Sequence, residues 1–206
     1  MKQLSSPGKW RNELKGFYVE SLALLRALGN RPAFLGVKIL SEKEGEANVY
    51  PGSRIYSLLL SNFGLVEKEI FLNFTSSPGL LLNAFEGSRV KIHWEEYPPR
   101  IEGAYMIVRA VVESAAMGDP AKIILSLEEE WIDENSVFPL TRATGLMIEA
   151  LIEASRFDIG RREERIRNFL FFIDRLKRVA EDETLLSALE KIEGRARKNE
   201  EHREKD

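Results

Sequence analysis

The apolar residues of this chain change their spacing near residue 135, and this change limits the folds that are available. Before it, short apolar runs alternate with polar residues and end at Gly, Pro or Asn, which is typical of strands and turns. After Pro139, apolar residues recur every three or four positions, which is typical of amphipathic helices. The pattern predicts an α+β protein in which a strand-rich part precedes a helical part.

The strand-rich part is expected to form a barrel. Gly29-Asn30 supplies the turn of a hairpin, and Lys43 to Gly45 supply the next polar turn. The predicted strands are separated by too few residues for every connection to be a crossover between parallel strands. An antiparallel split β-barrel with short helices is therefore predicted. The expected elements are strands over 17–28, 32–40, 47–50, 66–75, 101–117 and 121–132, with short helices that begin after Ser53 and after Pro78.

The helical part is expected to form a C-terminal three-helix appendage. Its amphipathic stretches begin at Pro139, after Gly160 and near Asp182, and short linkers join them into a small bundle. The predicted divisions are an N-terminal arm (1–16), the split-barrel domain (17–135), the helical subdomain (136–196) and a charged, disordered tail (197–206).

Composition excludes several classes of chemistry. Cysteine is absent and only two histidines occur, so thiolate chemistry is excluded and a metal site is not expected. The net charge of −3, with acidic residues interleaved among the arginines of 161–178, argues against nucleic-acid binding. No apolar stretch is long enough to cross a membrane and the first 16 residues lack a signal-peptide pattern, so a cytoplasmic protein is expected.

The segment VYPGSRIYSLL carries the strongest chemical signal. A strand ends at Pro51-Gly52, and Ser53 and Arg54 then begin a helix. A hydroxyl, helix-start amides and a guanidinium at one point are the groups that bind a phosphate monoester. The alternative is an ordinary strand, turn and helix with a serine cap and a surface arginine, which is a common arrangement.

Other polar positions have two interpretations each. Asn73 and Thr75 share one side of a strand, where they either meet the polar edge of a ring or are ordinary outward-facing polar residues. Gly36 marks either a bulge or a place where a flat group lies against the backbone. His93 with its neighbouring glutamates is interpreted as cross-strand pairing rather than a metal site. The run Glu128 to Glu130 is interpreted as protection of an edge strand.

Several of these segments together resemble one family. FYVESLALL, PAFLGV, VYPGSRIYSLL, IFLNFT and TRATGLMIEALIEASRF look like successive blocks of an uncharacterised, mainly archaeal domain-of-unknown-function family with an FMN-binding split barrel, similar in fold to flavin reductases and pyridoxamine-phosphate-oxidase-like proteins. The resemblance covers roughly residues 17–180. It implies a homodimer of FMN-binding split barrels that also meets a small-molecule substrate, with an oxidoreductase acting through bound flavin as the implied activity.

The resemblance also implies which residues hold the cofactor. The FMN phosphate is expected at Gly52, Ser53 and Arg54, with Tyr56 beside it. The isoalloxazine is expected along Phe34, Gly36 and Val37, with Asn73 and Thr75 on the strand block that follows. No residue stands out as an acid or a base, so catalytic residues are not assigned. Phe34-Leu35 and Leu58-Leu59 depart from the family pattern, and the alternative function is therefore a non-catalytic dimer with a decayed flavin pocket that acts as an interaction module.

Overall fold

The computed structural model describes residues 1–4, 10–16, 18–61, 64–88, 90–133, 142–177 and 187–194. Its strands are β1 (Lys2–Gln3), β2 (Tyr18–Leu24), β3 (Ala33–Ile39), β4 (Glu44–Val49), β5 (Glu69–Phe74), β6 (Ile92–His93), β7 (Arg100–Ile101), β8 (Met106–Ala116) and β9 (Ala121–Ile132). Its helices are α1 (Trp10–Glu13), a 3-10 turn (Arg26–Leu28), α2 (Arg54–Leu60), α3 (Pro78–Glu86), α4 (Arg142–Ala154) and α5 (Arg162–Lys177), and residues 187–194 are also helical.

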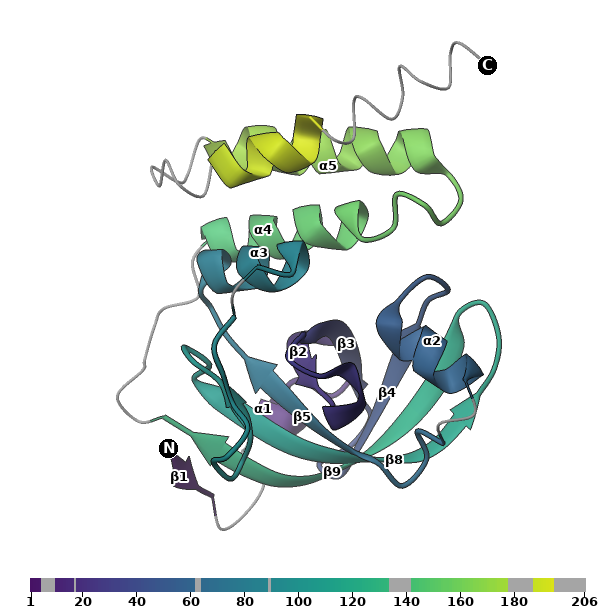
Figure 1. Ribbon diagram of the computed structural model, residues 1–206, viewed down its shortest axis with the longest axis vertical. Coiled ribbons are helices and arrows are strands. Elements are labelled where there is room, and N and C mark those ends of the chain that lie inside the picture. The colour runs from purple at the N-terminus through teal and green to yellow at the C-terminus, as the bar shows by residue number, and fades with distance from the viewer. Residues whose placement is uncertain are drawn as a thin grey trace. The chain divides into compact units, whose positions relative to one another are not determined.

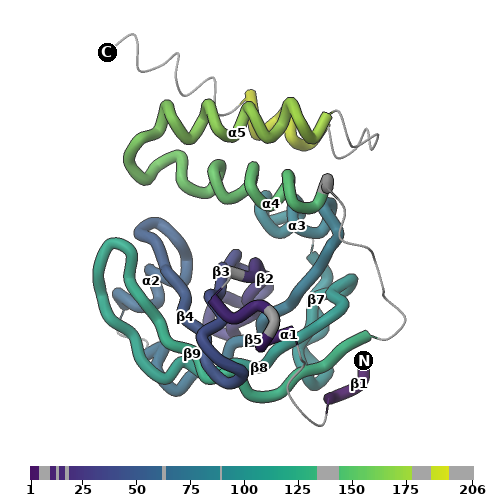
Figure 2. Tube along the Cα trace, turned by 180° about the vertical axis from the view of Figure 1, so that it is seen from behind, coloured from purple at the N-terminus to yellow at the C-terminus, as the bar shows by residue number. Residues whose placement is uncertain are grey.

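Six long strands close into an antiparallel barrel. The sheet runs in the order β9-β4-β3-β2-β5-β8, and β8 pairs back with β9, so that the sheet has no open edge there. Figure 1 shows these strands curving around a common interior, and Figure 2 shows β8 and β9 as one long hairpin. The predicted α+β class and split-barrel architecture are confirmed.

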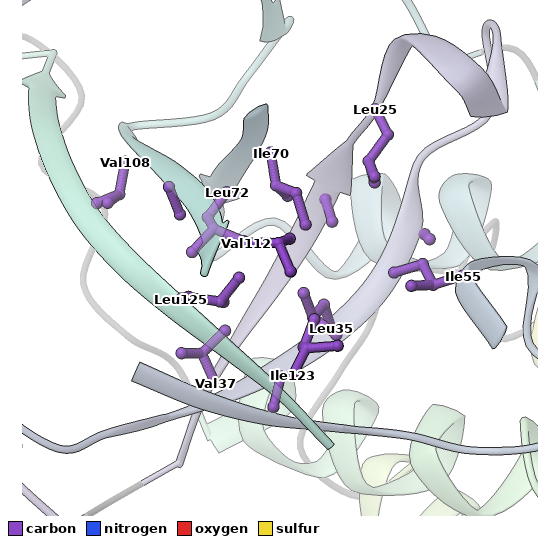
Figure 3. Close-up of a cluster of buried hydrophobic side chains, with 14 of the residues drawn as sticks. Leu25, Leu35, Val37, Ile55, Ile70, Leu72, Val108, Val112, Ile123 and Leu125 are labelled. Atoms are coloured by element: carbon purple, nitrogen blue, oxygen red, sulfur yellow. The ribbon is translucent and has the colours of Figure 1, made fainter. Parts of the chain in front are cut away.

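Alternation along each strand produces the barrel core. Ala33, Leu35, Val37 and Ile39 of β3 are all buried, and they join inward residues of the other strands in one apolar cluster. Figure 3 shows Leu35, Val37 and Leu125 among the side chains that gather there. Residues between these positions, such as Phe34 and Gly36, therefore lie on the outer face of the barrel.

Three predicted strand limits are wrong because turns intervene. The strand predicted over 17–28 ends at Leu24, and a 3-10 turn (Arg26–Leu28) follows it. Residues 101–117 do not form one strand: β7 pairs with β6 in a separate two-stranded sheet, and β8 begins only at Met106. Gly103 between them has φ +88°, a left-handed conformation that interrupts a strand. β4 begins at Glu44, inside the predicted turn, and Gly45 is the residue that lets it approach β3, because an added Cβ would lie 2.6 Å from a Val37 methyl group.

The edge-strand interpretation of Glu128 to Glu130 is also wrong. β9 is an interior strand that pairs with β4 and β8. Glu130 is only 2% exposed and forms an ion pair with Arg11, which is itself 0% exposed. Arg11 Nη1 also donates to the carbonyl oxygens of Glu42 (2.8 Å) and Leu127 (3.1 Å), while the Trp10 indole donates to Glu130 Oε1 (2.9 Å). These bonds tie α1 to the barrel.

A bulge explains why neighbouring glutamates of β9 reach one arginine. Between the pairs Val108↔Glu130 and Ala110↔Leu127 the register shifts, so Arg109 faces two residues of β9 instead of one. Its Nη2 lies 2.8 Å from Glu129 and also contacts Glu128, and its Nη1 lies 2.8 Å from Glu69. Arg109 is thus an arginine surrounded by carboxylates on the barrel surface.

The predicted structural pairing of His93 is confirmed, although with other glutamates than its neighbour Glu95. The ring nitrogens lie 3.0 Å from Glu96 and 3.2 Å from Glu102, across the β6–β7 hairpin. Arg100 bonds to Glu96 at 2.8 Å and Lys91 bonds to Glu102 at 2.6 Å. Among the residues that the structure describes, no group of acidic or histidine side chains is arranged to hold a metal ion.

The C-terminal helices form a second compact unit, which also includes Ser77–Leu82 at the start of α3. α4 and α5 pack against each other, and the buried side chains of these helices include Met147, Leu151, Ile166, Phe169 and Ile173. The predicted start of the third helix and the charged tail fall outside the described residues. No helix in the described ranges is long and apolar enough to cross a membrane.

Candidate functional site

The strands β3 and β4 separate at one end of the barrel. Their ladder covers only the pairs from Val37↔Ala47 to Ile39↔Gly45, although β3 begins at Ala33 and β4 continues to Val49. α2 follows β4 here, and its Ile55 side chain joins the core cluster (Figure 3). The first half of β3 and the start of α2 therefore border the stretch in which β3 and β4 do not pair, and this stretch is called the opening below.

The turn before α2 forms as the sequence predicts. Gly52 has φ +85°, which favours glycine, and a side chain there would meet no atom within 4 Å. Ser53 is the N-cap, since its Oγ accepts a hydrogen bond from the Tyr56 amide at 3.2 Å. The Tyr56 amide is thus already bonded within the chain, whereas the Ser53 hydroxyl still has its own hydrogen to donate.

Arg54 turns back onto the loop before β3. Its Nη2 donates to the Pro32 carbonyl oxygen at 2.5 Å, and its Nη1 donates to the Arg31 carbonyl oxygen at 3.3 Å. Burial lowers the pKa of Arg54, and the positive charge of Arg31 lowers it further. No carboxylate among the described residues opposes these effects at Arg54, so its guanidinium has a cationic neighbour in Arg31.

The loop that carries Arg31 is held from a second side by the β6–β7 hairpin. The Trp94 indole nitrogen donates to the Asn30 side chain at 2.8 Å, and the Arg26 guanidinium lies 5.5 Å from the centre of the Trp94 ring. The Arg31 guanidinium lies beside Gly87, where an added Cβ would be 3.9 Å from it, an ordinary contact distance. The backbone positions next to Arg54 are thus fixed by contacts on both sides.

The outer face of β3 carries the two other predicted contacts. Phe34 packs edge-to-face with Phe85 of α3 at 6.4 Å between ring centres. Gly36 pairs with Glu20 of β2, and a Cβ on Gly36 would lie 2.9 Å from Glu20 Oε1. Val37 differs from both, since it is buried in the barrel core and its side chain faces away from this surface. On β3, Phe34 and Gly36 therefore remain the candidates for a side-chain or backbone contact at the outer face.

The remaining predicted residues serve other contacts. The Tyr56 hydroxyl donates to the Gly118 carbonyl oxygen at 3.1 Å, which joins α2 to the β8–β9 turn. Asn73 is 1% exposed, so it is not an ordinary outward-facing polar residue: its amide donates to Phe71 and accepts from the Ile101 amide. Thr75 donates to the Gly103 carbonyl oxygen at 3.3 Å. Asn73 and Thr75 thus fix the end of β7 and the segment that follows it, and β2 lies between their strand and β3.

Two residues of the site were not predicted from the sequence. Arg31 has no local signal, because its proximity to Arg54 comes from the fold of the barrel. Glu20 is not among the expected cofactor contacts, and its position depends on the register of the β2–β3 hairpin. In the structure Glu20 lies opposite Gly36, and this register is centred on Leu28 in the 3-10 turn rather than on Gly29-Asn30, so the predicted turn alone does not place Glu20 there.

Comparison with solved structures supports the same architecture. The structure is similar to an FMN-bound protein from Methanosarcina mazei of the family DUF447, with 16% identity, a TM-score of 0.66, and coverage of 89% of this chain and 96% of that chain. The sequence matches no family model and no curated protein. The chain has the fold of that protein, a split barrel with a helical unit.

Two more distant similarities involve a part of the chain. A UbiD-class enzyme from Pelotomaculum thermopropionicum, solved with prenylated FMN, is 12% identical over 68% of this chain and 42% of that chain, with a TM-score of 0.48. The styrene monooxygenase flavin reductase from Pseudomonas putida S12 is 12% identical over 61% of this chain and 86% of that chain, with a TM-score of 0.42.

Proposed function

We propose that the protein binds FMN at the opening between β3 and β4. The observation that carries this proposal is the position of Arg54, whose sequence neighbours do not explain its contacts: within the described part of the chain its guanidinium donates to the backbone carbonyl oxygens of Arg31 and Pro32, and the cation beside it is Arg31. Such a pair of arginines favours an anion, and a phosphate monoester matches the fork of an arginine. The fold shared with an FMN-bound protein supports the choice of FMN among phosphate ligands.

The chain offers groups suited to each part of this ligand. Arg54 is oriented by the carbonyl oxygens of Arg31 and Pro32, and these bonds use only two of its five N–H donors. Ser53 offers a hydroxyl donor beside it. Phe34 and Gly36 present an aromatic ring and a bare backbone on the outer face of β3, against which a flat ring system can lie.

Bound FMN would supply hydride or electron transfer, and the proposed activity is that of an oxidoreductase with a small-molecule substrate. The chain's own contribution is to neutralise the phosphate charge, to orient the ring along β3 and to limit access of water. No residue is assigned as a proton donor or acceptor for a substrate.

The test is a spectrum followed by a titration. The freshly purified protein should show flavin absorbance, or should bind added FMN with micromolar or tighter affinity. Arg54→Ala should weaken binding by about 10–100-fold, because charge-assisted hydrogen bonds are lost. Arg109→Ala is the matched control, since Arg109 is also an arginine on the barrel but is surrounded by Glu69, Glu128 and Glu129.

A different result would favour the second function. A colourless protein that binds no FMN at micromolar concentration would refute FMN binding and support a barrel with a decayed pocket that acts as an interaction module. Free phosphate binding without FMN binding would retain the anion site and reject the flavin. Equal affinity of wild type and Arg54→Ala for FMN would place the cofactor elsewhere.

The proposed assembly is a homodimer. Apolar side chains near the opening support it: Leu60 at the end of α2 is 63% exposed, and Met117, next to the turn that Tyr56 contacts, is 52% exposed. Light scattering on the eluting protein should give about twice the mass of one chain. Leu60→Glu should shift the mass towards one chain if this surface forms the interface, and an unchanged mass would locate the interface elsewhere.

A further inference from the structure

Glu20 and Gly36 form an unusual pair at the opening. They face each other in the β2–β3 ladder, and both carboxylate oxygens of Glu20 lie close to the place where a side chain of residue 36 would begin. A Cβ on Gly36 would be 2.9 Å from Oε1, 3.2 Å from Oε2 and 3.3 Å from Cδ. The carboxylate therefore lies across the backbone of β3 because residue 36 is glycine.

Three chemically different groups follow one another along β3, and the carboxylate of Glu20 is the last of them. The guanidinium of Arg54 is bonded at Pro32, an aromatic ring follows at Phe34, and the carboxylate of Glu20 lies over Gly36. Four residues of a strand span about 13 Å. Cation, aromatic surface and acceptor thus follow one another on one face, next to the point where β3 and β4 stop pairing.

FMN carries complementary groups in the same order. Its phosphate is at one end, its flat ring system follows, and the far edge of the ring has an imide N–H between two carbonyl groups. An ionised carboxylate is only a hydrogen-bond acceptor, so it recognises this N–H and disfavours a ligand in which the hydrogen is replaced.

On the basis of the proposed FMN site, we propose that Glu20 determines specificity by accepting a hydrogen bond from the imide N–H of the flavin ring, and that Gly36 is required because it leaves room for the carboxylate. Glu20 is a binding residue for the ring edge rather than a catalytic acid or base. Any ligand with a flat ring and an imide N–H at that distance from a phosphate shares this recognition.

The experiment compares FMN with N3-methyl-FMN, which lacks this hydrogen. Wild type should bind N3-methyl-FMN at least tenfold more weakly than FMN, because a hydrogen bond to a charged group is lost. Glu20→Ala should weaken FMN binding by about tenfold and bring the two ligands to within about threefold of each other. Gly36→Ala should have the same effect with Glu20 present, since its methyl group displaces the carboxylate.

Glu46→Ala is the matched control. Glu46 lies on the outer face of the same sheet, where it faces Lys38 of β3 and lies 3.6 Å from Lys122. This variant should keep the discrimination of wild type. Glu20→Gln, which preserves the size of the side chain, replaces Glu20→Ala if the alanine variant does not fold, and it should also reduce the discrimination.

The failures of the two proposals are distinguishable. If wild type binds FMN and N3-methyl-FMN equally while Arg54→Ala loses affinity for both, the role of Glu20 is refuted and the FMN site stands. If Glu20→Ala keeps the tenfold discrimination, another group reads the imide. If wild type binds neither ligand, both proposals fail.

Discussion

Arg11 and Arg54 are both desolvated arginines of the barrel, and their surroundings differ. Burial lowers the pKa of each, but the charge and the hydrogen bonds of Glu130 oppose this effect at Arg11, whereas the charge of Arg31 adds to it at Arg54. Arg11 is thus balanced inside the chain. Within the described ranges, Arg54 is bonded to neutral carbonyl oxygens only and adjoins a second cation. The difference separates an arginine that stabilises the fold from one that is suited to a ligand.

The largest expected effect is on the balanced arginine. Glu130→Ala should lower the free energy of unfolding by about 3–5 kcal/mol, because Arg11 remains buried without its counter-charge. Denaturant unfolding measures this loss. The control is Glu129→Ala, whose carboxylate is partly exposed and bonded to Arg109, and it should cost about 1 kcal/mol or less. Equal losses in the two variants would show that Arg11 is not held by Glu130.

The unbalanced arginine should behave in the opposite way. Arg54→Ala should change the free energy of unfolding by less than about 1 kcal/mol, since the lost carbonyl bonds are offset by relief of repulsion from Arg31. Its FMN affinity should nevertheless fall by the 10–100-fold expected for a lost charged contact. A loss of stability as large as that of Glu130→Ala would remove the distinction between the two arginines.

A third variant tests a residue that the sequence placed in the site and that the structure shows in an internal contact. Asn73→Ala leaves the buried Ile101 amide without the side-chain acceptor it now has, so we expect a loss of about 1–3 kcal/mol in unfolding free energy. Folded Asn73→Ala should bind FMN within about threefold of wild type. A larger loss of affinity at unchanged stability would show that Asn73 contacts the cofactor directly.

The sequence predicted most where the interactions are local. The cap by Ser53, the hairpin around Gly29-Asn30 and the amphipathic face of α5 each depend on residues a few positions apart, and the structure contains all three. The pairs Arg11–Glu130 and Arg31–Arg54 join residues far apart in the chain, so no spacing rule could indicate them. Val37 lies between the local and the long-range cases. Strand alternation is a local rule, and it is enough to place the Val37 side chain on the face of β3 opposite that of Gly36.

The smallest expected effect concerns charges that are neither buried nor isolated. The hydrogen bond from Arg100 lowers the pKa of Glu96, and those from Lys91 and His93 lower the pKa of Glu102. Because both values lie below the ordinary 4.5, the ionised carboxylates stabilise the β6–β7 hairpin above that pH, and the contribution is lost as the pH falls through the lowered values.

Trp94 in the same hairpin reports this loss. Its indole N–H signal in NMR spectra should shift in one step with a midpoint below pH 4.5, as its bond to Asn30 weakens. Glu102→Gln should reduce the step, and 1 M salt should diminish it, because exposed charges are screened. The Trp10 indole, bonded to buried Glu130, should respond much less to salt. Equal salt dependence of the two indole signals would mean that burial does not distinguish the carboxylate of Glu130 from that of Glu102. The contrast between Arg11 and Arg54 would then need an explanation other than desolvation.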